Sequence, residues 1–233
     1  MIKIFADGAD AVKMLENRKR GVVSGFTTNP TLMRKAGVLK YREFARLVLE
    51  QIPDMPISFE VFSDDFVWME RDAEEIASWG KNVYVKIPIQ TTKGEYTLSV
   101  LKNLSNQGIK VNVTAILTNS QVRRAVSSLN DDVPAIISVF AGRIADTGVD
   151  PMPIMREAVF STHSASDNFE CLWASCREVL NIKQAEQCGC DIITVPNDIL
   201  KKMEMFGKDL NELSLETVQM FYDDAKAAGY SIW

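Results

Sequence analysis

The sequence predicts a single (β/α)8 barrel over residues 1–233, ending in an extra helix at about residues 214–228. Short apolar runs alternate eight times with longer amphipathic stretches, which is typical of parallel strands joined by right-handed helical crossovers. The alternative is an open doubly wound sheet. It lacks its usual signature, because no Gly-x-Gly-x-x-Gly follows the first strand and no Walker loop occurs.

The eight apolar runs are the expected strands, and each is short and rich in β-forming residues. They cover residues 2–7, 22–27, 56–62, 83–88, 110–114, 135–140, 170–175 and 191–195. The amphipathic stretches are the expected helices. They cover residues 41–51, 66–79, 96–105, 120–129, 153–159, 177–187, 196–205 and 214–228. No linker, internal repeat or composition shift divides the chain, which favours one domain.

Composition narrows the class of protein. An apolar content of 46% and a mean hydropathy of -0.05 are typical of a soluble globular chain. The net charge of -5 leaves no basic excess to neutralise the phosphates of a nucleic acid. No run reaches transmembrane length, and the first residues lack the basic-then-apolar pattern of a leader. We therefore expect a cytoplasmic protein with no nucleic-acid and no membrane partner.

The cysteines and the single histidine give no metal-site pattern. Cys188 and Cys190 are too close in sequence for the usual paired motif, so these two, with Cys171 and Cys176, are expected to be reduced thiols. His163 stands in a long polar stretch, and any Ser-His-Asp triad or His-containing zinc site would need it. We expect a solvated loop histidine, no metal and no cofactor.

Polar residues within the expected strands fall on one parity. Val83, Val85 and Ile87 share a face suited to packing on helices, so Lys86 points into the barrel. The same alternation turns inward Asp7, Glu60, Asn112, Thr114, Ser138 with Phe140, and Ser175, while Thr27 and Asn29 end the second strand. Most of these residues sit near the C-terminal end of a strand, where barrel enzymes assemble their sites.

Each of these residues also has a structural explanation. A lysine at a strand end can extend to water, and Glu60 can belong to a structural ion pair. Asn29 before Pro30 can cap a helix as its N-cap residue. As a set, however, a lysine, two carboxylates and several hydroxyls and amides are costly to bury, so a functional site is the simpler interpretation.

The inward lysine suggests a Schiff base. A lysine amine has a pKa of roughly 10.4 in water, and burial in an apolar strand between Val85 and Ile87 disfavours its charged form. A neutral amine attacks a carbonyl, and the resulting imine is an electron sink for carbon–carbon cleavage. Asp7 and Glu60 are the available acid/base groups for this chemistry.

The sequence also indicates an anion site in the segments that follow the sixth and seventh strands. Arg143 follows the sixth strand, and Ser175 and Arg177 follow the seventh at an expected helix start. Two guanidiniums, a hydroxyl and a helix N-terminus suit a phosphate. The alternative, two surface arginines in solvated loops, stays open at this point.

These residues resemble the transaldolase family over nearly the whole chain, especially its short branch that includes fructose-6-phosphate aldolase. The most specific motifs are Thr27-Thr-Asn-Pro30 and Val85-Lys-Ile-Pro88, with support from Asn112-Val-Thr-Ala115 and Gly142-Arg-Ile144. The resemblance implies that Lys86 forms the Schiff base and that Asp7 handles the proton of the C4 hydroxyl of the sugar. It implies that Glu60 and Thr114 hold the water of imine formation.

For substrate binding, the resemblance implies three groups. Asn29, Asn112 and Ser138 bind the hydroxyls of the dihydroxyacetone unit, with Thr27 and Phe140 at the same site. Arg143, Ser175 and Arg177 bind the phosphate. Small-molecule sugar phosphates are thus the expected partners, and a homo-oligomer, a pentamer or decamer, is expected if the C-terminal helix reaches a neighbour instead of the parent barrel.

Two positions bear on the reaction. Glu60 and Phe140 follow the transaldolase pattern, whereas fructose-6-phosphate aldolases resemble one another in carrying glutamine and tyrosine there. Phenylalanine cannot protonate the bound enamine, so transfer of dihydroxyacetone from fructose 6-phosphate or sedoheptulose 7-phosphate to an aldose phosphate is favoured. Cleavage that releases dihydroxyacetone is the alternative, and a non-catalytic barrel that binds a sugar phosphate is a third.

Overall fold

Eight parallel strands close into a barrel in this computed structural model, which describes residues 2–233. Each strand pairs with the next along the chain, and β8 pairs with β1. The strands are β1 (Lys3–Asp7), β2 (Gly25–Thr27), β3 (Ile57–Glu60), β4 (Val83–Pro88), β5 (Val111–Ile116), β6 (Ala135–Val139), β7 (Phe169–Trp173) and β8 (Ile192–Pro196). The predicted (β/α)8 barrel is confirmed, and the doubly wound alternative was wrong.

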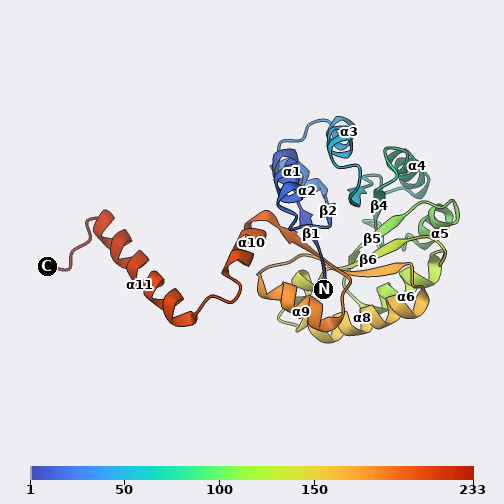
Figure 1. Cartoon of the computed structure of the whole chain (residues 1–233). Coiled ribbons are helices and arrows are strands. Elements are labelled where there is room, and N and C mark those ends of the chain that lie inside the picture. The colour runs from blue at the N-terminus through green and yellow to red at the C-terminus, as the bar shows by residue number, and fades with distance from the viewer. Residues whose placement is uncertain (1) are drawn as a thin grey trace. The chain divides into compact units, whose positions relative to one another are not determined.

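Helices lie outside the strands of the barrel unit (Figure 1). They are α1 (Ala11–Arg20), α2 (Pro30–Lys35), α3 (Tyr41–Gln51), α4 (Phe66–Ala77), α5 (Leu98–Asn106), α6 (Asn119–Ser128), α7 (Ala141–Asp146), α8 (Pro151–Ala165), α9 (Leu180–Cys188) and α10 (Asn197–Lys202). We did not predict α1 or α7. Helix α1 buries only Met14 and Asn17, so its apolar pattern is weak; Asp10 caps it instead by accepting from two backbone amides.

The chain divides into two compact units, one that extends to Leu200 and one that covers Lys201–Trp233. The second unit contains the 3₁₀ helix η1 (Met203–Met205) and α11 (Leu210–Ala227). The expected C-terminal helix is therefore present and begins four residues earlier than predicted, because Asp209 caps it. Whether both units act as one domain over residues 1–233 stays a prediction.

Both faces of the strands are buried, as a parallel barrel requires. Val83, Val85 and Ile87 are at most 3% exposed on the face of β4 toward the helices. On the opposite face, an interior cluster fills the barrel; it comprises Phe5, Ile136, Leu172, Ala174 and Ile192, with Tyr84 and Phe140 packed against it. This apolar cluster and the polar inward side chains lie on the same face of the strands.

His163 does not lie in a loop, so this expectation was wrong. It belongs to α8, which starts at Pro151 under an Asp150 cap and extends well beyond residues 153–159. Its ring Nε2 lies 2.8 Å from Asp191 Oδ2, and its side chain is about half exposed. The buried face of α8, which includes Met155 and Ala158, makes this polar stretch helical.

The four cysteines are free thiols and are buried, as expected for a reduced chain. Within residues 2–233, no helix is both long enough and apolar enough to cross a membrane.

Candidate active site

Lys86 extends into the barrel from β4 and is 6% exposed. The register pairs it with Glu60 on β3, and Lys86 Nζ lies 3.1 Å from Glu60 Oε2. The same nitrogen donates to the backbone oxygen of Thr28 at 3.0 Å. Val85 and Ile87 point the other way, so they do not surround the amine as the sequence suggested. Both partners accept a hydrogen bond from this nitrogen, and the nitrogen needs a free lone pair before it can attack a carbonyl.

Tyr41 holds the backbone that carries Glu60. Its hydroxyl donates to Glu60 O at 2.9 Å, and its ring packs against Phe59, Phe62 and Trp79 with centroids 4.6–6.1 Å away. These aromatic contacts fix the end of β3 from outside the barrel. No pattern in the sequence indicates this role, because Tyr41 is simply an aromatic residue at the start of the amphipathic stretch that forms α3.

Asp7 ends β1 beside Thr27, which donates to Asp7 Oδ1 at 2.8 Å. Burial raises the pKa of the Asp7 carboxyl above its ordinary value. The Lys86 charge and the Thr27 hydrogen bond oppose this shift in the pKa, and the Glu60 charge adds to it. A carboxyl with a raised pKa can exchange a proton nearer to neutral pH, as an acid/base group requires.

Thr27 also contacts Thr194 on β8 through their hydroxyls. Sequence reasoning missed Thr194. The available signal was a lone hydroxyl in the apolar run Ile192-Ile-Thr-Val-Pro196, on the inward parity.

A series of buried hydrogen bonds joins polar side chains from three strands, β3, β5 and β6. Ser138 Oγ donates to Asn112 Oδ1 at 2.7 Å, and Asn112 Nδ2 donates to Ser58 Oγ at 2.9 Å. These bonds fix the orientation of the Asn112 amide, whose strand position is paired with Lys86. Ser58 was missed, although it has the same parity as Glu60 on β3.

Thr114 is the next inward-facing residue of β5 after Asn112. Its hydroxyl differs from the Asn112 amide in its hydrogen bonding. Its Oγ1 is buried and makes no hydrogen bond within residues 2–233. An unpaired buried hydroxyl costs about 1–3 kcal/mol, so it is available to a ligand. The next residue, Ala115, has φ 59° at a register shift in β5, which is a locally strained backbone.

Asn29 adopts the capping role that the sequence left open. Its Oδ1 accepts from Leu32 N at 3.0 Å, and Pro30 begins α2. The amide nitrogen of Asn29 makes no hydrogen bond to the residues that the structure describes. One side chain can therefore cap the helix and still donate to a ligand.

Phe140 and Arg143 lie beyond β6. Phe140 packs on the interior cluster, and the Arg143 guanidinium carbon lies 5.4 Å from the centroid of its ring. Gly142 brings α7 against the end of β7, because a Cβ on this residue would stand 1.6 Å from Ser175 O. Ser175 itself has φ 64°, a conformation that is uncommon for a residue other than glycine. This backbone contact fixes Arg143 and Ser175 near each other.

The helix start expected at Ser175 and Arg177 was wrong. Helix α9 begins at Leu180, because Asn181 Oδ1 accepts from the backbone N of Arg177 at 2.8 Å and from that of Glu178 at 3.2 Å. These two backbone amides thus already donate to a side chain of the protein. The candidate anion site has no helix N-terminus at Ser175.

Arg177 is also engaged by a carboxylate. Its Nε donates to Asp146 Oδ1 at 3.2 Å, and its Nη2 forms an ion pair with Asp146 Oδ2. Both side chains are about half exposed, so the pair is weak and can exchange for another anion. A phosphate bound by Arg177 would compete with Asp146.

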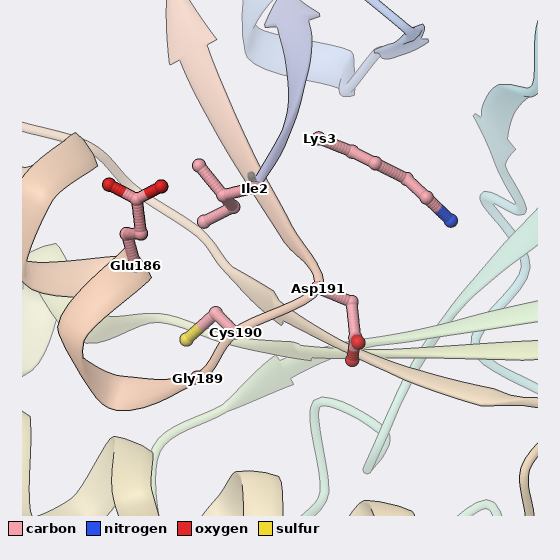
Figure 2. Close-up of a pocket in the computed structure, with 6 residues that line it drawn as sticks. All are labelled: Ile2, Lys3, Glu186, Gly189, Cys190 and Asp191. Carbon is pink, nitrogen blue, oxygen red and sulfur yellow. The ribbon is translucent and has the colours of Figure 1, made fainter.

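No group of three or more His, Cys, Asp or Glu side chains within residues 2–233 is arranged to hold a metal ion. A hollow of about 310 Å³ lies at the other end of the barrel, where β1 and β8 begin, and Figure 2 draws the residues that line it. It is lined by Ile2, Lys3, Glu186, Gly189, Cys190 and Asp191. None of the candidate residues reaches this hollow, because they stand at the C-terminal ends of the strands.

The chain is similar to known proteins along nearly its whole length. The profile of the Transaldolase/Fructose-6-phosphate aldolase family matches residues 4–232. A protein named probable transaldolase from Thermoanaerobacter sp. (strain X514) is 36% identical over 233 residues, 99% of this chain and 100% of its own. Another protein of that name, from Streptococcus agalactiae serotype V, is 33% identical and covers 97% of this chain and 99% of its own.

Among solved structures, a putative dihydrodipicolinate synthase family protein from Coccidioides immitis superposes with a TM-score of 0.58. The match covers 92% of this chain and 74% of that protein at 14% identity. At this identity the likeness shows the fold alone.

The raised pKa of Asp7 predicts the effect of Asp7→Asn on stability. Above the folded-state pKa the buried carboxylate destabilises the fold, whereas below the unfolded pKa of about 3.9 both states bind the proton and no penalty remains. Asp7→Asn should therefore raise the thermal midpoint at neutral pH, and this gain should shrink as the pH falls toward about 4. Circular dichroism melts across this range, with exposed Asp132→Asn as the control, test it. A gain that does not depend on pH would contradict it.

Proposed function

Because this chain belongs to the transaldolase/fructose-6-phosphate aldolase family, we propose that it transfers a dihydroxyacetone unit from a ketose phosphate to an aldose phosphate. The donor would be fructose 6-phosphate or sedoheptulose 7-phosphate, and Lys86 would carry the unit as a Schiff base. The observation that carries the proposal is the buried Lys86 amine, 3.1 Å from the Glu60 carboxylate inside the barrel. The mechanism uses no metal and no cofactor.

Imine formation begins with a proton transfer. Glu60 is the carboxylate in contact with the Lys86 ammonium, so it takes the proton and leaves a neutral amine. The amine attacks the C2 carbonyl of the ketose, and the carbinolamine oxygen leaves as water after protonation. Glu60 and the unpaired Thr114 hydroxyl hold this water, and the same groups return it when the imine is hydrolysed.

Carbon–carbon cleavage then needs a base at the C4 hydroxyl. Asp7, with its raised pKa, takes this proton while the C3–C4 bond breaks and its electron pair moves into the protonated imine. The aldose leaves, and the enamine remains on Lys86. The reverse sequence with an acceptor aldehyde forms a new C3–C4 bond, and Asp7 returns the proton to the new hydroxyl.

The remaining polar residues bind the substrate in this proposal. Asn112 and Ser138, oriented by the series of buried hydrogen bonds, would bind hydroxyls of the three-carbon unit, and Asn29 would donate from its free amide nitrogen. Thr27 positions Asp7 at the same site. The phosphate would bind Arg143, Ser175 and Arg177 once it displaces Asp146 from the last of these.

We further propose that the protein works in the cytoplasm as a homo-oligomer, a pentamer or decamer, in which α11 serves assembly. Large apolar side chains of α11 are exposed; Leu215, Val218 and Tyr222 recur at helical spacing and are 62–71% exposed. Such a stripe is typical of a helix that packs on a partner surface.

Sedimentation equilibrium of the full chain tests the assembly. We expect a mass five or ten times the 26.1 kDa of one chain, because a covered stripe removes apolar surface from water. Val218→Asp should lower this mass by placing a charge within the stripe, whereas the exposed substitution Glu212→Asp on the same helix should not. A monomeric mass for the unmodified chain would contradict the proposal.

Borohydride reduction tests the Schiff base. With fructose 6-phosphate present, reduction should fix a stable adduct on Lys86, identified by peptide mass spectrometry. Lys86→Met should lose the adduct and reduce kcat on the order of 10³-fold or more, because the nucleophile itself is gone. Lys102→Met, an exposed lysine on α5, should retain both.

Circular dichroism should first establish that Lys86→Met folds, since the change leaves Glu60 unpaired. A folded Lys86→Met protein that still transfers the three-carbon unit would rule out the mechanism. Saturable sugar-phosphate binding without any adduct would instead indicate the non-catalytic barrel.

Acceptor dependence tests transfer against cleavage. Turnover of fructose 6-phosphate should require erythrose 4-phosphate, because Phe140 has no hydroxyl with which to protonate the enamine. Phe140→Tyr should raise the rate of dihydroxyacetone release without acceptor, and Phe140→Leu should not. Equal turnover of the unmodified enzyme with and without acceptor would favour the aldolase alternative.

A further inference from the structure

A second hollow, of about 670 Å³, opens at the N-terminal end of the barrel, opposite the candidate active site. Three lysines, one tyrosine and two carboxylates lie among its lining residues: Lys3, Lys81, Lys110, Tyr84, Asp54 and Glu170. They come from the starts of β1, β4, β5 and β7 and from the loops that precede β3 and β4. We call it the lysine hollow.

The charges in the lysine hollow do not balance. Lys3 forms an ion pair with Glu170, and Asp54 is held by two hydrogen bonds from Arg18, at 2.9 and 3.0 Å. Within residues 2–233, neither Lys81 nor Lys110 forms an ion pair. Two of the lysines that line the hollow therefore have no carboxylate partner among the described residues.

Lys110 is the more enclosed of the two. Its Nζ donates to the backbone oxygen of Lys81 and lies 5.1 Å from the centroid of the Tyr84 ring. Burial lowers the pKa of the Lys110 ammonium, and no carboxylate among the described residues pairs with it to oppose this effect. An ammonium has three donors, so two remain after the bond to Lys81.

Tyr84 adds a neutral donor. Its hydroxyl makes no hydrogen bond to any residue that the structure describes, and its ring is half-buried against the interior cluster. Burial and the Glu170 charge raise the pKa of Tyr84 to about 12, so the hydroxyl keeps its proton at neutral pH. A protonated hydroxyl in a hollow that is also lined by Lys81 and Lys110 matches the acceptor oxygens of a phosphate.

We propose that the lysine hollow is a second ligand site, which binds a phosphate monoester dianion through Lys81, Lys110 and the hydroxyl of Tyr84. The dianion neutralises the two unpaired charges, and its terminal oxygens accept from all three groups. The hollow in Figure 2 does not suit an anion, because its lining carries two carboxylates, Glu186 and Asp191, and one lysine, Lys3. The site is separate from the catalytic lysine and is independent of the reaction proposed above.

Pyridoxal 5′-phosphate is a probe that reports position. Its aldehyde condenses with a lysine amine with loss of water, and borohydride reduces the imine to a stable secondary amine. Peptide mass spectrometry then measures the labelling of each lysine of the full chain separately. Labelling of Lys86, at the other end of the barrel, is thus told apart from labelling in the lysine hollow. We expect Lys110 to be labelled about tenfold faster than exposed Lys102, and inorganic phosphate to suppress only this excess.

Two variants test the noncovalent contacts. Lys81→Met should weaken the protection of Lys110 by inorganic phosphate about tenfold, because one charge-assisted contact is lost. Tyr84→Phe keeps the ring and should weaken this protection of Lys110 by a smaller factor. Lys102→Met should leave the protection unchanged. Equal labelling of Lys110 and Lys102, or protection that Lys81→Met does not alter, would overturn the proposal.

Discussion

The ion pair between Lys86 and Glu60 is the interaction on which the rest of the site depends. Neither charge would be stable alone inside the barrel, because desolvation of a single ion costs several kcal/mol. The pair forms because β3 and β4 are adjacent in a register that sets Glu60 beside Lys86, each on the inward face. The closed sheet, the strand parity and the aromatic contacts of Tyr41 all serve to hold these two groups together.

The barrel and the inward polar set were predictable from the sequence. Successive side chains of a strand point to opposite faces of the sheet. Once Val83–Pro88 is recognised as a strand, its sequence therefore shows on which face Lys86 lies. We missed Thr194 and Ser58, although the same rule puts both on the inward face. Only their hydrogen bonds to Thr27 and Asn112 required the structure. Residues that share one face of a strand are thus readable from the chain alone.

Helix ends and side-chain competition were not predictable in the same way. Asn181 folds back onto Arg177 and Glu178, which delays α9 to Leu180; this depends on a side-chain rotamer rather than on periodicity. We predicted a loop at His163 because the residues around it are polar. The apolar residues that α8 buries stabilise the helix through this position. Asp146 and Arg177 are 31 residues apart, so nothing local to either one indicated their pairing.

The contact between Gly142 and Ser175 limits how this protein can be redesigned. With the backbone oxygen of Ser175 where a Cβ would stand, position 142 accepts no other amino acid without moving the loop that follows β7. Arg143, Asp146 and Arg177 are exposed or half exposed and carry no such restriction. A mutant library aimed at new sugars should therefore randomise these three codons and leave the glycine codon untouched.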